Sequence, residues 1–105
     1  MIIYNITFHI ENAILEECLV FLKETYIPTA LKNEILDAPR LCKVLGKSED
    51  DSSSYALQFQ VESVEKLNDW WKCNGEELNA LLVKQFAGKV MGFTTLLEQL
   101  EHRPV

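Results

Sequence analysis

Polar side chains that can bind or act on a small molecule recur within the first ten residues. Asn5, Thr7 and His9 alternate with apolar residues between Tyr4 and Ile10. A period of two is typical of a β-strand with one buried face, so these three side chains share the other face. Imidazole suits acid–base chemistry near neutral pH. His9 is therefore a candidate catalytic base, the alternative being a hydrogen-bonded or solvent-exposed histidine at a rim.

A second alternating run and a tryptophan pair add further candidates. Gln58 and Gln60 interrupt the apolar series from Tyr55 to Val61, which predicts a strand whose amides lie beside Asn5 and Thr7. Adjacent helical residues lie about 100° apart, so one tryptophan of the pair is expected in the core and the other exposed or at an interface. Stacking on a ligand is the alternative. The candidate ligand-binding residues are Asn5, Thr7, Gln58, Gln60, Trp70 and Trp71.

Sequence motifs of other common catalytic and metal-binding sites are missing. The sequence contains no nucleophile elbow, phosphate loop, zinc spacing or paired-carboxylate pattern. The stretch from Ser48 to Ser54 is acidic but lacks the glycine and the ligand spacing of a calcium loop, so it is predicted to be a solvated hairpin loop without a metal. His102 falls in the expected polar tail.

Composition limits the class of protein. With 105 residues and 48% hydrophobic composition, the chain fits one domain over residues 1–105, with a polar tail from about residue 98. A net charge of −6 with dispersed basic residues argues against nucleic acid. No apolar run approaches the roughly 20 residues that span a bilayer, and no secretory signal is visible. The three cysteines form no C-x-x-C motif and are expected to be free and buried, in the cytoplasm.

The remaining pattern predicts two helical regions and two more strands. An apolar stripe predicts a helix from an Asn12 N-cap to about Thr25, with a break or kink at Pro28. A strand is expected over Arg40–Lys47. The second helical region follows the N-cap Ser63, is broken at Asn74-Gly75, restarts with a capping box formed by Asn74 and Glu77, and stops at Gly88. Val90–Leu97 is the last expected strand.

This order predicts an α+β fold of the ferredoxin-like βαββαβ type, a four-stranded antiparallel sheet with both helices on one face. The other face would carry neutral hydrogen-bonding groups rather than lysine and glutamate, which indicates partial cover. Two such faces can meet around a twofold axis, so a homodimeric barrel is expected. The alternative is a sheet face that is exposed to solvent and has no partner.

The chain resembles a family of short bacterial proteins, common in Bacteroidetes, that are classed as a domain of unknown function. The resemblance rests on Met1-Ile2-Ile3-Tyr4-Asn5-Ile6-Thr7, Tyr26-Ile27-Pro28, Ala38-Pro39-Arg40-Leu41 and Phe93-Thr94-Thr95-Leu96-Leu97. It covers nearly the whole chain and implies a ferredoxin-like fold related to the dimeric α+β-barrel superfamily. It implies no activity.

That superfamily includes cofactor-free monooxygenases, isomerases and haem-degrading enzymes. The haem-degrading type has an Asn on strand one and a Trp and a His on the second helical region. Asn5 resembles that Asn, and Trp70 or Trp71 resembles that Trp. The His has no counterpart, because residues 79–82 contain no histidine. We therefore expect no cofactor. The favoured function is a noncatalytic dimeric module for a small-molecule ligand or for assembly. The alternative is a cofactor-independent monooxygenase or isomerase in which His9 is the base and Asn5, Thr7 and Gln58 orient the substrate.

Overall fold

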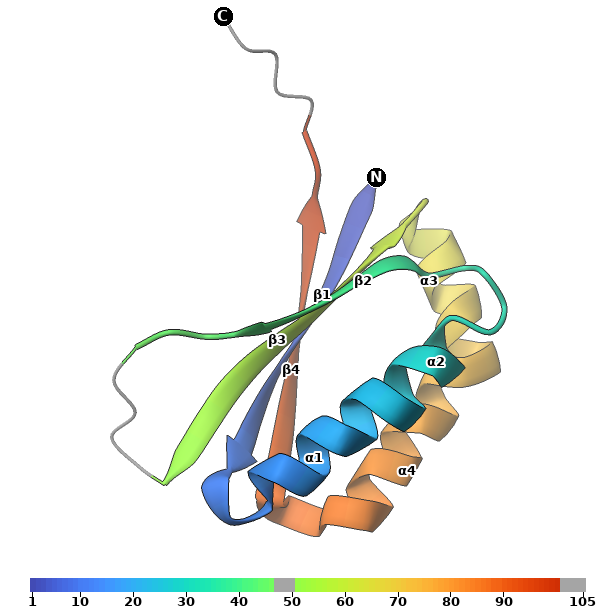
Figure 1. The fold of residues 1–105 in the computed structure, drawn as a ribbon. Helices are drawn as coiled ribbons and strands as arrows, with labels where there is room; N and C mark the ends of the chain where they lie inside the picture. Colours follow the sequence, from blue (N-terminus) through green and yellow to red (C-terminus); the bar gives the residue numbers. More distant parts are fainter. Residues whose placement is uncertain (47–50, 101–105) are drawn as a thin grey trace, which may run out of the picture.

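The computed structural model describes residues 1–46 and 51–100. Its four strands form one antiparallel sheet in the order β2-β3-β1-β4 (Figure 1). The strands are β1 Ile2–Glu11, β2 Asp37–Lys43, β3 Ser52–Val61 and β4 Val90–Glu98. One helical region, with α1 (Leu15–Phe21) and α2 (Ile27–Ala30), connects β1 to β2, and another, with α3 (Val64–Trp70) and α4 (Glu76–Phe86), connects β3 to β4. The predicted βαββαβ order is confirmed.

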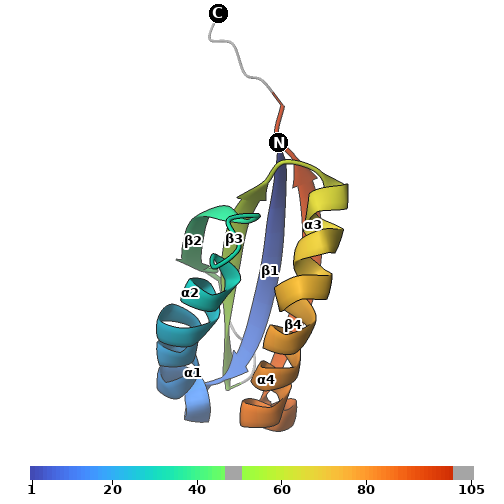
Figure 2. The same cartoon turned by 90° about the vertical axis from the view of Figure 1, so that its right-hand side faces the viewer.

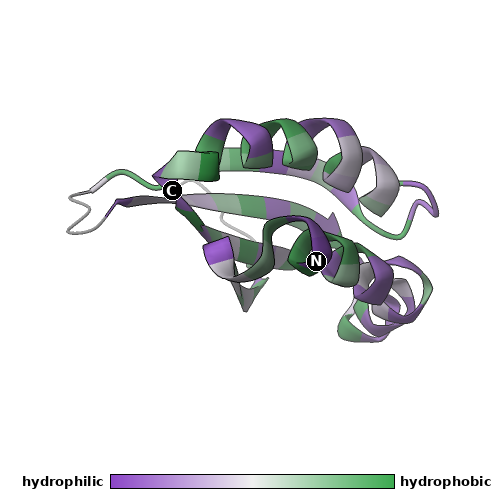
Figure 3. Cartoon of the chain, turned by 90° about the horizontal axis from the view of Figure 1, so that it is seen from below, coloured by the Kyte–Doolittle hydropathy of each residue, from purple (hydrophilic) through white to green (hydrophobic). Residues whose placement is uncertain are grey.

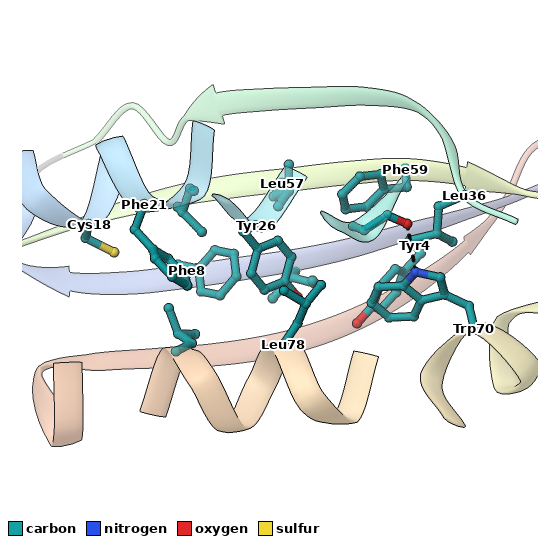
Figure 4. Close-up of a cluster of buried hydrophobic side chains, with 14 of the residues drawn as sticks. Tyr4, Phe8, Cys18, Phe21, Tyr26, Leu36, Leu57, Phe59, Trp70 and Leu78 are labelled. Atoms are coloured by element: carbon teal, nitrogen blue, oxygen red, sulfur yellow. Dashed lines mark hydrogen bonds between the residues drawn. The ribbon is translucent and has the colours of Figure 1, made fainter. Parts of the chain in front are cut away.

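Both helical regions lie on one side of the sheet, with β1 behind the space between them (Figure 2). Hydrophobic and hydrophilic residues recur in turn along the helices (Figure 3), as expected where one helix face packs on a sheet. The alternation of β1 directs Tyr4, Ile6, Phe8 and Ile10 into the core. There they meet aromatic residues from the helices and β3, among them Phe21, Tyr26, Phe59 and Trp70 (Figure 4). Phe86 belongs to the same core.

The first helical region does not break at Pro28. A 3₁₀ turn at Asn12–Ile14 leads into α1, a π-helical turn at Leu22–Tyr26 follows, and α2 continues to Ala30. Pro28 is the second residue of α2, where its missing N–H is tolerated, so the chain stays helical. The predicted Asn12 cap is also wrong, because the Asn12 Oδ1 atom instead accepts a hydrogen bond from the Ser53 hydroxyl at 2.7 Å.

The second helical region begins as predicted and then continues where a break was expected. The Ser63 hydroxyl oxygen accepts a hydrogen bond from the Lys66 backbone N–H at 3.2 Å. A π-helical turn at Trp71–Gly75 joins α3 to α4, and the Asn74 amide does not cap α4 but donates to the Thr29 carbonyl at 3.0 Å. α4 ends at Phe86, and its C-cap residue is Ala87, with a φ of +50°, rather than the predicted Gly88.

Two strand boundaries also differ from prediction. β2 begins three residues earlier than Arg40, at Asp37, and ends at Lys43. Residues 52–54, predicted to be loop from their serine composition, are the first three residues of β3. Three predicted features lie outside the described residues: the part of that loop from Ser48 to Asp50, the end of the predicted second strand at Lys47, and the tail from Glu101, which includes His102. None of the described helices is long and apolar enough to cross a membrane.

Candidate functional site

The sheet side opposite the helices, here called the open face, carries the odd-numbered residues of β1. The register of the four strands aligns their side chains in rows across the sheet. Asn5 stands opposite Gln58 on β3 and Thr95 on β4, and Gln58 stands opposite Arg40 on β2. Arg40, Gln58, Asn5 and Thr95 therefore form a polar row across the whole open face. The predicted sharing of one face by Asn5, Thr7, His9, Gln58 and Gln60 is confirmed.

Asn5 lies at the centre of this row and is 8% exposed, although no helix covers it. Its Nδ2 atom donates to the Thr7 hydroxyl oxygen at 3.1 Å. Its Oδ1 atom is buried and accepts no hydrogen bond. An unsatisfied buried acceptor costs about 1–3 kcal/mol, so this atom lowers the stability of the single chain.

His9 lies further along the same face, held between two serines. The Ser52 hydroxyl is 2.6 Å from Nε2, and the Ser54 hydroxyl is 2.9 Å from Nδ1. A neutral imidazole has one donor and one acceptor, so one serine donates to the ring while the other accepts from it. Sequence reasoning missed these serines because their composition indicated a loop; the alternation of β3, continued backwards to residue 52, would have placed them beside His9.

The position of Ser52 bears on what this group can do. An imidazole that accepts a proton from a serine hydroxyl can activate that hydroxyl as a nucleophile. Ser52 is only 5% exposed, however, so a substrate has little access to its hydroxyl. The arrangement suits a histidine that holds the ends of β1 and β3 together better than one that acts on a substrate.

Apart from Thr95, the residues of β4 that stand opposite Ile3, Asn5, Thr7 and His9 on the open face are apolar. Opposite His9, Thr7 and Ile3 stand Met91, Phe93 and Leu97, which are 54%, 56% and 43% exposed. β4 is an edge strand, and these three side chains form an apolar stripe along it. A large apolar stripe beside a polar centre is typical of a surface that another molecule covers.

Hollows on opposite sides of the sheet involve the predicted ligand-binding residues, and Gln60 also lines a third, of about 410 Å³, with Met1, Gln99 and Leu100. Gln58 and Gln60 line a hollow of about 130 Å³ on the open face, together with Ile3, Arg40 and Gln99. Trp70 and Trp71 instead line a hollow of about 180 Å³ beside β4 on the helix side, together with Tyr4, Thr94 and Leu96. Asn5 and Thr7 line none of these hollows but share the face of the two glutamines, so the six predicted ligand-binding residues lie on two opposite sides of the sheet. A larger hollow of about 450 Å³ between α2 and α4 contains none of them.

The tryptophan pair divides as expected. Trp70 is fully buried, and its indole N–H donates to the Ala30 carbonyl at 2.9 Å. Trp71 is 40% exposed. Asn5 and Trp70 point to opposite sides of the sheet, so they cannot line one pocket.

Burial changes the titration of three groups on the helix side. Burial raises the pKa of Tyr4, although a hydrogen bond with Thr94 partly opposes the effect, and burial also raises the pKa of Tyr26. Burial raises the pKa of the Cys18 thiol to about 11, which makes it unreactive. All three cysteines are free, as predicted, but Cys42 and Cys73 are exposed, which corrects the expectation that all would be buried. Among the described residues no group of His, Cys, Asp and Glu side chains could hold a metal ion.

Comparison with known proteins identifies a matching family and solved structures with a similar fold. A family model described as a domain of unknown function, DUF4286, matches residues 1–100. The crystal structure of HapK from Hahella chejuensis is similar with a TM-score of 0.72 and 10% identity, over 100% of this chain and 98% of that one. An ethyl tert-butyl ether d (EthD) family protein from Bacillus halodurans is similar with a TM-score of 0.67 and 15% identity, over 95% of this chain and 100% of that one. No curated protein matches the chain. At these identities the likeness establishes the fold alone.

Proposed function

We propose that this chain, which belongs to the DUF4286 family, is a noncatalytic module that forms a homodimer through its open face and holds a small ligand between the two sheets. The observation that carries the proposal is the exposed apolar stripe of Met91, Phe93 and Leu97 beside the polar row, on a face that no described element of the chain covers. A second molecule over this face would remove the stripe from water.

A second copy of the chain is the occupant that the surface favours. Four strands about 4.8 Å apart, with a rise of about 3.4 Å over roughly nine residues, give a face of about 600 Å² before side-chain relief is added. A stable interface buries about 800 Å² per partner, so a sheet-sized partner is needed to cover it. The mixture of an apolar stripe with neutral amides and hydroxyls is self-compatible, because two copies meet without opposing like charges along most of the face.

The contacts of His9 favour binding over catalysis. Its ring nitrogens contact Ser52 and Ser54, and Ser52 is nearly inaccessible. A base for a bound substrate needs a lone pair directed at the ligand, whereas these contacts occupy both nitrogens. We therefore give His9 a structural role at one end of the interface. The free and exposed thiols of Cys42 and Cys73 support a reducing compartment, and we propose the cytoplasm.

Static light scattering during gel filtration at micromolar concentration tests the dimer. We expect twice the 12.1 kDa mass of the chain, because an uncovered apolar stripe favours association. A mass of one chain across the micromolar range would exclude the proposed assembly.

A further inference from the structure

Arg40 lies on the open face because β2 is irregular. Asp37 stands opposite Gln60, so a regular antiparallel ladder would put Arg40 opposite Leu57, on the core side. A bulge between Asp37 and Arg40 adds one residue to β2, and Arg40 stands opposite Gln58 instead. The bulge therefore directs a guanidinium group onto the open face.

The chain adopts an unfavourable backbone conformation to make this bulge. Ala38 has a φ of +49°, a left-handed conformation that costs a residue with a Cβ about 1–2 kcal/mol. A hydrogen bond from the Ala38 N–H to the Asp37 carboxylate, at 2.7 Å, supports the turn. Bulges that persist at such a cost are common next to binding sites, where they re-aim a side chain.

The redirected arginine borders the 130 Å³ hollow. Ala38, Gln58, Gln60 and Gln99 also line this hollow. No acidic residue among those described lines it. The hollow thus combines a guanidinium group with carboxamide groups that donate hydrogen bonds.

We propose that this hollow is a carboxylate site and that the ligand of the dimer is a small organic acid. This inference rests on the proposed function, because the partner's sheet would close the hollow. Guanidinium binds a carboxylate through two parallel hydrogen bonds, and neighbouring amide NH₂ groups can donate to the same oxygens. The volume lies well below the roughly 300–1,000 Å³ of pockets for drug-sized molecules, so it suits a small acid and not a large cofactor.

Benzoate titration followed by backbone amide NMR tests the site, with benzamide as the uncharged probe of the same shape. We expect saturable shifts at Arg40, Gln58 and Gln60, and binding of benzamide weaker by about tenfold, the equivalent of one hydrogen bond to a charged group. Arg40→Gln should weaken benzoate binding by a similar factor. Lys43→Gln is the matched control, because it removes a cation from the same strand on its other face.

The outcomes separate this inference from the proposed function. Any of three results would overturn the carboxylate site. These are equal affinity of the wild type for benzoate and benzamide, equal affinity of Arg40→Gln and Lys43→Gln for benzoate, and amide shifts confined to the helical layer. If the chain remains dimeric by light scattering while benzoate fails to bind, the carboxylate site alone is wrong. A monomeric wild-type protein would instead overturn the proposed assembly.

Discussion

Gly75→Ala is expected to lower the free energy of unfolding by about 3 kcal/mol, at the upper end of the usual range for overpacking. A Cβ atom at this position would overlap Cζ3 of Trp70 and lie 2.6 Å from Cε3 of Trp71. Trp71 is partly exposed and has room to move. Trp70 is fully buried and fixed by its hydrogen bond to Ala30, so the strain cannot be relieved without displacing the core.

Urea unfolding followed by tryptophan fluorescence measures this effect. Gly88→Ala is the matched control, since a Cβ there meets no atom within 4 Å and the backbone φ is not positive. Its stability should stay within about 1 kcal/mol of wild type. Loss of any cooperative transition in Gly75→Ala agrees with the account, whereas equal stability of the two variants would show that the close approach of Gly75 to the tryptophans is wrong.

Phe93→Glu is expected to convert the proposed dimer into a monomer, with dimer affinity falling by at least about a hundredfold. Phe93 stands opposite Thr7 in the middle of the apolar stripe of β4. By twofold symmetry the substitution places two unpaired carboxylates in the interface, and burying an unpaired charge costs several kcal/mol. Because Phe93 is 56% exposed in the single chain, the fold itself should tolerate the change.

Sedimentation velocity over a concentration series measures the shift. Val83→Glu is the matched control, because Val83 is 55% exposed but lies on α4, in the helical layer. This control should remain dimeric with the affinity of wild type. Dissociation by Val83→Glu and not by Phe93→Glu would move the interface to the helices.

The alternation of apolar residues was sufficient to predict the sheet and its facing. Between Tyr4 and Ile10 the buried and open sides follow the pattern residue by residue, because a strand has a fixed period of two. The facing of the second strand was harder to predict. The bulge before Arg40 shifts the alternation by one residue, and no local sequence pattern indicates the bulge. The start of β3 was missed because Ser52 to Ser54 lack apolar side chains, although they pair with β1.

Helix interruptions were misplaced for a similar reason. Pro28 and Gly75 are both residues that disfavour helices, and both predicted a break. In the structure each lies in or just after a π-helical turn, and the helix continues because tertiary packing outweighs the local preference. Gly75 is there for the space that two tryptophans need, which depends on contacts and not on local propensity.

The candidate site shows the same limit. The sharing of one face by Asn5, Thr7 and Gln58 follows from periodicity, but the serine contacts of His9, the missing partner of Asn5 Oδ1 and the position of Arg40 all depend on register between strands. Register is a long-range property, set here by the bulge and by the extension of β3. Single-strand patterns therefore located the face but not its chemistry.

The central claim is that two open faces meet, and isotope-filtered NOE spectroscopy on an equimolar mixture of ¹³C-labelled and unlabelled protein tests it most directly. We predict intermolecular NOEs that involve the Met91 methyl group and the Leu97 methyl groups, both on the apolar stripe of β4. Leu81 and Val83 on α4 should give none. Intermolecular NOEs confined to α4, or none in a sample at millimolar concentration, would contradict the account.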